Sequence, residues 1–441
     1  MFGVKSKPVL VLAGVFIVVM ALLPFHAVIS TWAISNFGYE TLIKAWKELL
    51  ILFVALPITG WILYKDVKLR NKIFGSRINQ LVFLFAALCL LMIPFNNNGT
   101  KPEIAGLVFN LRFFVMFIIA QVLALKFVKE DFRELLLRIL FWGGVVVVVF
   151  GALQVLVLPN DFLRHFGYQK SIIPPYFTID TNESFVRILS TLRGPNALGA
   201  YLVFWLPMLA IVTKRMWSVA NKYKVYAAIL WALSFITLYG SKSRSAWIGA
   251  AIALAAVVWL LVNNQWKKRL VLLGMAGFAV LAVGLAVNWN SSFVQTTIMH
   301  RDPNQGNDED SDVLRQESIV TSIKSIINNP LGTGVGSANL ASTYGTKPNT
   351  IENYYLQVAT ELGVVGLLVF MAILVLVAKK LWDLRAHDIA VALLAGFIGI
   401  AVVNLVLPGW EDETLAMLWW GMAGLIMFAK SSTKHTKSAT V

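Results

Sequence analysis

Two short polar motifs each place an arginine at the mouth of a long apolar run. Arg193 lies in Ser190-Thr-Leu-Arg-Gly-Pro-Asn-Ala-Leu-Gly199, and Arg244 lies in Ser241-Lys-Ser-Arg-Ser245 beside Lys242. An arginine fork binds phosphate oxygens through paired hydrogen bonds, and Pro195 favours a helix start whose free N–H groups attract anions. With Asn196 and Lys242 as further binding residues, the motifs indicate a pyrophosphate site. Binding to lipid phosphates at the membrane edge is the alternative for both arginines.

A third polar motif, Glu352-Asn353-Tyr354, follows a long polar segment and opens another apolar run. A carboxylate beside an amide in a half-desolvated site is suited to act as a general base, with Asn353 and Tyr354 as candidate substrate-binding residues. The alternative is that Glu352 only complements the dipole of the helix that starts there.

Two further cations lie close to or within apolar runs. Arg112 interrupts the run from Leu107 to Leu123, and an intramembrane charge usually faces a polar interior, which predicts a cavity-lining, substrate-binding role. Lys44 and Lys47 share one face if the following helix begins early, and Lys47 is a candidate binding residue. A solvated or lipid-bound face is the alternative for this pair.

The elements that position these residues are membrane helices. Apolar residues make up 58% of the 441-residue chain and charged residues only 14%, in long apolar runs that predict an all-α polytopic membrane protein. We expect about twelve spanning helices, with both chain ends on one side. Their ranges are 8–24, 48–64, 79–95, 105–125, 136–158, 195–213, 224–240, 244–262, 269–288, 352–378, 388–407 and 411–429.

Basic residues support this topology. Most of the 38 Lys and Arg residues fall in the loops on the side of the two termini, which the positive-inside rule makes cytoplasmic. The net charge of +15 is thereby assigned to loops that face anionic membrane lipids, and a nucleic-acid partner is not indicated.

The external segment 289–351, between the ninth and tenth predicted helices, is long enough to carry function. Apolar residues at helical spacing predict an amphipathic helix at about 313–328, which we expect to act as a lid in one integral domain spanning 1–441. Arg315 lies on this helix and is a candidate substrate-binding residue. The acidic run Asp308–Asp312 lacks the spacing of an EF-hand, so no metal site is predicted.

Four stretches resemble the O-antigen ligase and polymerase superfamily of bacterial GT-C-type membrane glycosyltransferases. They are Arg193–Gly199, Ser241–Gly249, Arg315 with Asn329–Gly336, and Glu352–Gly366. The resemblance implies transfer from an undecaprenyl-pyrophosphate-linked glycan to a glycan or glycolipid acceptor, at the external face of the bacterial cytoplasmic membrane. It also implies an inverting reaction without metal or cofactor, with Arg193 and Arg244 on the phosphates, and it suggests a chain-length regulator as a further partner.

Glu352 stands where ligases of this superfamily commonly carry a histidine. The resemblance therefore favours polymerase-like transfer over a lipid A-core ligase. The alternative function is a transporter or flippase for an anionic lipid-linked or small solute, in which the same arginines would line the path.

Overall fold

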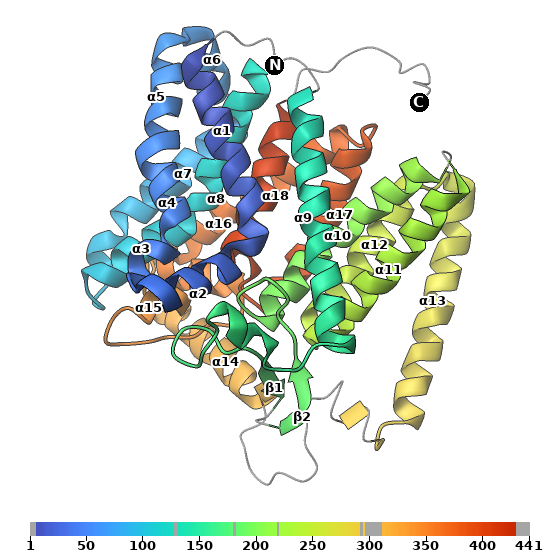
Figure 1. The fold of residues 1–441 in the computed structure, drawn as a ribbon. Coiled ribbons are helices and arrows are strands. Elements are labelled where there is room, and N and C mark those ends of the chain that lie inside the picture. Colours follow the sequence, from blue (N-terminus) through green and yellow to red (C-terminus); the bar gives the residue numbers. More distant parts are fainter. Residues whose placement is uncertain are drawn as a thin grey trace.

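The computed structural model describes residues 6–127, 131–179, 182–217, 220–291, 294–295 and 311–428. Within these ranges, long helices run side by side and the only sheet is a pair of short antiparallel strands (Figure 1). Nine helices of the described part are long and apolar enough to cross a membrane. The chain is therefore an all-α polytopic membrane protein, as its sequence predicts.

The first half of the chain, up to the sheet, consists of helices and short helical turns. Their bounds are α1 Lys7–Leu22, η1 Leu23–Phe25, α2 His26–Phe37, α3 Glu40–Lys44, α4 Trp46–Leu50, the π-helical turn η2 Ile51–Ala55, α5 Leu56–Lys65, α6 Val67–Phe74, α7 Arg77–Leu91, η3 Ile93–Phe95, α8 Thr100–Lys126, α9 Asp131–Leu156 and η4 Phe162–Phe166.

The second half begins with the two strands and continues with helices. The bounds are β1 Phe177–Ile179, β2 Asn182–Arg187, α10 Pro195–Met216, α11 Asn221–Ser241, α12 Arg244–Leu261, α13 Asn264–Val287, α14 Ser311–Asn328, α15 Asn339–Ser342, α16 Tyr354–Asp383, α17 Asp388–Val403, η6 Gly409–Glu411 and α18 Glu413–Met427.

Every predicted spanning range overlaps one of these helices, although several boundaries differ. The predicted helices at 136, 269 and 352 begin instead at Asp131, Asn264 and Tyr354. Helices α17 and α18 are apolar but only 16 and 15 residues long, so the total of twelve spans remains a prediction.

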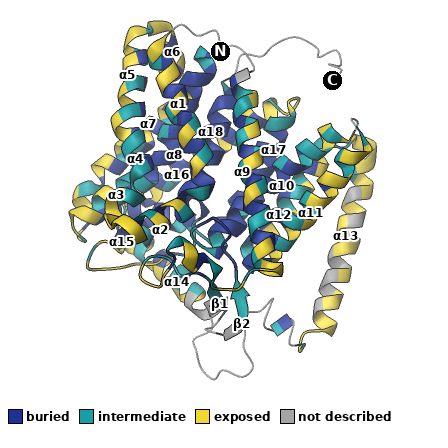
Figure 2. Cartoon of the chain, viewed as in Figure 1, coloured by how far each residue is buried: buried dark blue, intermediate teal, exposed yellow. Residues whose placement is uncertain are grey.

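Helix α18 forms the centre of the bundle. All of its residues are buried (Figure 2). Trp419 and Trp420 are fully enclosed. A side chain at Gly424 would lie 2.5 Å from the carbonyl oxygen of Phe117 on α8, so the glycine allows these two helices to approach closely. The outward faces instead carry exposed apolar side chains such as Phe53 and Leu368, as lipid contact requires.

The bundle has two distinct ends. Helix α6 lies at one end, called the α6 end, whereas α14 and the β1–β2 hairpin lie at the opposite end, called the α14 end (Figure 1). The observed α14 overlaps the predicted amphipathic helix at 313–328. Its role as a lid stays a prediction, and residues 296–310 of the external segment, including most of its acidic run, lie outside the described residues.

The segment 329–336, called the strap, connects α14 to the bundle interior. Helix α16 is broken at Gly363, whose φ is 70°, and the strap fills the break. The N–H of Val364 donates to the carbonyl of Pro330 at 2.9 Å, while the N–H groups of Thr333 and Gly334 donate to the carbonyls of Thr360 and Glu361 at 2.8 and 3.1 Å. The carbonyls freed by the broken helix thus regain partners, which a bilayer interior demands.

Candidate active site

Arg187 lies at the centre of a polar junction at the α14 end. It is the last residue of β2, and the next residue, Ile188, donates its N–H to the carbonyl of Gly240 at 3.0 Å. The Arg187 guanidinium donates from Nε to the carbonyl of Ser241 at 3.1 Å and from Nη2 to Oδ1 of Asn196 at 2.7 Å. One side chain therefore joins β2, the C-terminus of α11 and the first turn of α10.

Two more arginines, on other elements, lie near enough to Arg187 for their charges to repel it. Burial, followed by the charges of Arg244 at the start of α12 and Arg315 on α14, lowers the pKa of Arg187 to about 10. Arg187 is still a cation near neutral pH, but its surroundings disfavour that charge. An anion that bound here would relieve the repulsion among the three guanidinium groups.

Glu352 meets this group through Arg315, with which it forms an ion pair. Asn353 caps α16: its Oδ1 accepts from the N–H of Leu356 at 3.0 Å, and its Nδ2 donates to the carbonyl of Leu405 at 2.8 Å. Glu352 therefore precedes the helix, which begins at Tyr354 rather than at the predicted residue 352. The two side chains of the ion pair are 30% and 36% exposed, which leaves them within reach of a substrate.

Arg193 lies beside the acidic residues that open α18. Its Nε lies 3.3 Å from Oδ2 of Asp412. Burial alone would lower the pKa of Arg193, but the carboxylates of Glu413, Asp412 and Glu411 outweigh it and raise the pKa above its usual value. The pairing of Arg193 with Arg244 on one pyrophosphate thus remains a prediction, and Arg193 already has an acidic partner.

Lys47 and Arg112 are enclosed in a buried ionic network. Arg112 donates from Nη1 to Glu48 at 3.0 Å, and its Nη2 lies 3.2 Å from a carboxylate oxygen of Glu413. Nζ of Lys47 lies 3.1 Å from the other oxygen of Glu48. Both cationic side chains are only 3% exposed, so the network holds α4, α8 and α18 together. Their roles in substrate binding remain predictions.

The other predicted binding residues lie in defined local settings. Lys242 directly follows the last residue of α11 and adopts a left-handed conformation with φ 49°. Its Nζ lies 4.2 Å from the ring centre of Tyr239. Tyr354 is 1% exposed and packs its ring against Phe370. Neither contact identifies a ligand, so their binding roles stay untested.

Arg187 and the acidic residues at 411–413 are the functional candidates that sequence reasoning did not select. A sequence signal exists for both. Arg187 is an arginine on the predicted external side, against the topological bias, and three consecutive carboxylates open the apolar run of α18. Only the fold shows what each of them contacts.

Comparison with protein families gives one match. Residues 228–371 match the family model described as O-antigen ligase. The matched stretch contains Arg244, Arg315 and Glu352 and ends within α16, while Arg187 and Arg193 precede it. A comparison with curated proteins found no match.

Proposed function

We propose that this chain, whose residues 228–371 match the O-antigen ligase family model, belongs to the O-antigen ligase and polymerase superfamily and transfers a glycan from undecaprenyl pyrophosphate to a growing cell-surface polysaccharide. The observation that carries the proposal is the convergence of Arg187, Arg244 and Arg315 from three separate elements beside Glu352. Such a group suits a ligand with several negative charges next to a bond that must be broken.

The arginines bind and stabilise the leaving group. A pyrophosphate offers oxygens to more than one guanidinium fork, and its charge increases at the bridging oxygen as the bond to the sugar breaks. The Arg187 guanidinium, fixed by Asn196 and the Ser241 carbonyl, needs little reorganisation at that moment. The arginines supply countercharge without a metal ion.

Glu352 accepts the proton from the acceptor. In the proposed step the acceptor hydroxyl oxygen forms a bond to the anomeric carbon, the bond from that carbon to the phosphate oxygen breaks, and configuration inverts. The hydroxyl proton passes to Glu352, and undecaprenyl pyrophosphate leaves with the bonding electron pair. Arg315 orients the carboxylate until the acceptor binds.

The α14 end is the external face in this proposal, and the protein resides in the bacterial cytoplasmic membrane. A carboxylate at 352 favours polymerase-like transfer to another glycan over transfer to lipid A-core.

The amphipathic α14 covers the donor as a lid, because Arg315 pairs with Glu352 and Ser318 donates to the carbonyl of Thr350, just before α16.

The test uses the purified full chain in nanodiscs with an undecaprenyl-pyrophosphate-linked glycan and candidate glycan acceptors. We expect release of undecaprenyl pyrophosphate together with a lengthened acceptor. Arg187→Ala and Arg244→Ala should abolish both products, whereas Arg164→Ala should retain them, because the Arg164 side chain is 66% exposed and pairs with Asp161.

Movement of the intact lipid-linked glycan across the bilayer, without release of the pyrophosphate lipid from any acceptor mixture, would contradict the proposal. That result would favour a flippase. Equal activity of Arg187→Ala and Arg164→Ala would contradict the assignment of the site.

A further inference from the structure

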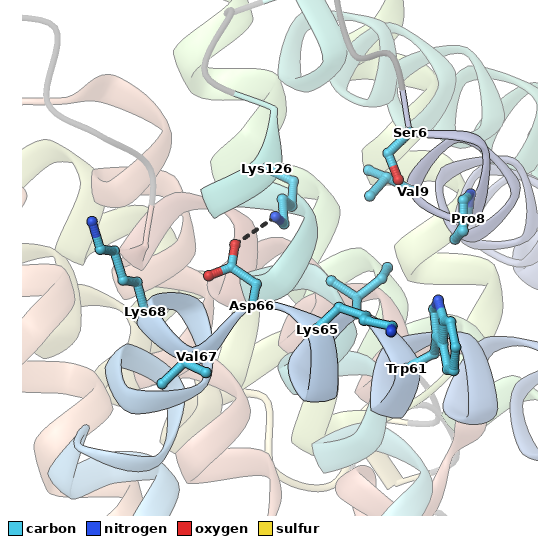
Figure 3. A pocket seen from close by; sticks show the side chains of 10 residues that line it. Ser6, Pro8, Val9, Trp61, Lys65, Asp66, Val67, Lys68 and Lys126 are labelled. Atoms are coloured by element: carbon cyan, nitrogen blue, oxygen red, sulfur yellow. Dashed lines mark hydrogen bonds and ion pairs between the residues drawn. The ribbon is translucent and has the colours of Figure 1, made fainter.

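A recess of about 550 Å³ lies at the α6 end, far from the arginine junction in the fold. The start of α1, the end of α5, the start of α6 and the end of α8 surround it (Figure 3). Ser6, Trp61, Lys65, Asp66, Lys68 and Lys126 are among its lining residues. No step of the proposed transfer uses this recess.

The recess has a net positive lining. Asp66 is already engaged, since Oδ1 accepts from the N–H of Leu69 at 2.9 Å and Oδ2 binds Lys126 at 2.6 Å. Lys65 and Lys68 form no ion pair with any carboxylate in the described part of the chain. Two lysines in the lining are thus available to an anion.

An apolar groove of about 440 Å³ adjoins the recess. It is lined by Val11, Pro57 and Ile58 together with Lys7, and it shares Pro8 and Trp61 with the recess. Nζ of Lys65 lies 4.8 Å from the ring centre of Trp61, so a cation stands at the boundary between the two. The positive recess can bind the anionic headgroup of an amphiphile, and the adjoining apolar groove can bind its hydrocarbon chain.

Three candidate membrane spans each have one terminus beside the recess. Lys7 begins one span, Lys65 ends the next and Lys126 ends a third, which puts the recess at the depth of lipid headgroups. Trp61 has the interfacial location that tryptophan prefers. The groove, lined by residues further along α1 and α5, extends from there toward the hydrocarbon.

We propose that the recess and groove together bind one anionic phospholipid. Its phosphate lies near Lys65 beside the groove, Lys68 adds positive charge on the other side of Asp66 (Figure 3), and one acyl chain lies along Pro57, Ile58 and Trp61. Basic residues near a membrane surface attract anionic headgroups, and the apolar groove adds a contact that a free phosphate ion lacks. The site is independent of the proposed transferase reaction.

Native mass spectrometry of the full chain with equal amounts of phosphatidylglycerol and phosphatidylcholine tests this site. We expect preferential retention of one phosphatidylglycerol molecule. Lys65→Gln/Lys68→Gln should reduce the preference by about tenfold, and Lys65→Arg/Lys68→Arg should retain it. Trp61→Ala should weaken retention of both lipids. The matched control is Lys379→Gln/Lys380→Gln, which removes two exposed lysines near the end of α16.

An unchanged preference in Lys65→Gln/Lys68→Gln would overturn the proposal. An equal loss in the control would do the same, because it would show that overall charge rather than a site attracts the lipid. Displacement of bound phosphatidylglycerol by glycerol phosphate at similar concentration would also overturn it, since the groove would then contribute nothing.

Discussion

Arg315 and Glu352, 37 positions apart, form an ion pair that connects α14 to the residue just before the cap of α16. The pair brings the external segment to the one carboxylate that the sequence marks as a candidate base. It also gives that carboxylate a fixed orientation beside the arginine junction.

Replacing Glu352 tests its catalytic role. We expect Glu352→Gln to reduce kcat by about 10² to 10⁴-fold, because the amide keeps the shape but cannot accept the acceptor proton. Glycan transfer by purified protein measures the effect. Glu317→Gln is the matched control, an exposed carboxylate on the same helix as Arg315, and should leave kcat unchanged. Full turnover by Glu352→Gln would remove this residue from the chemistry.

Arg187 should give the site a characteristic dependence on alkaline pH. Its pKa is lowered to about 10, so the side chain is charged below pH 10 and loses its charge as the pH rises through that value. Affinity for farnesyl pyrophosphate, a short pyrophosphate lipid, should therefore fall above pH 10. Binding titrations from pH 9 to 11 measure it.

The Arg244→Gln variant sharpens that test. Removing one repelling neighbour should raise the pKa of Arg187, so the affinity for farnesyl pyrophosphate should fall at a higher pH. In Arg187→Gln the affinity should no longer fall over this pH range. A fall that persists in Arg187→Gln would assign the pH dependence to another group.

Arg112 should contribute mainly to stability. Arg112→Gln leaves the buried carboxylates of Glu48 and Glu413 with a missing partner, so we expect a loss of about 3 to 5 kcal/mol in the free energy of unfolding. Lys44→Gln breaks an exposed pair with Glu40 and should change it by less than about 1 kcal/mol. Thermal unfolding in detergent compares the stability of the Arg112→Gln and Lys44→Gln variants. A stable Arg112→Gln protein that no longer binds donor would instead support the predicted binding role.

The strap should tolerate no side chain at Gly334. Its φ is 100°, and a Cβ there would lie 2.3 Å from the backbone nitrogen of Asn96. Gly334→Ala should therefore cost at least about 2 kcal/mol of unfolding free energy and lower the Tm. Gly14→Ala is the control, because nothing lies within 4 Å of a Cβ at that position in α1, and it should not lower the Tm. Equal Tm values for the two variants would show that the strap is not held in the break of α16.

The sequence alone determined the parts of this protein that depend on local composition. Apolar runs long enough to span a bilayer predict the helices, and apolar spacing within 289–351 predicts α14, because both patterns are read within about twenty residues. The motifs around Arg244, Arg315 and Glu352 likewise predict a similarity to the O-antigen ligases, whose family model matches residues 228–371.

Tertiary structure decided which charges meet. Arg187 bonds to Ser241 across 54 positions of the chain, Arg112 pairs with Glu413 from a distant part of the sequence, and Arg193 pairs with Asp412. Nothing in the local pattern distinguishes a cation that faces substrate from one neutralised in the interior. That choice depends on which helix ends pack together, and packing is a property of the assembled bundle.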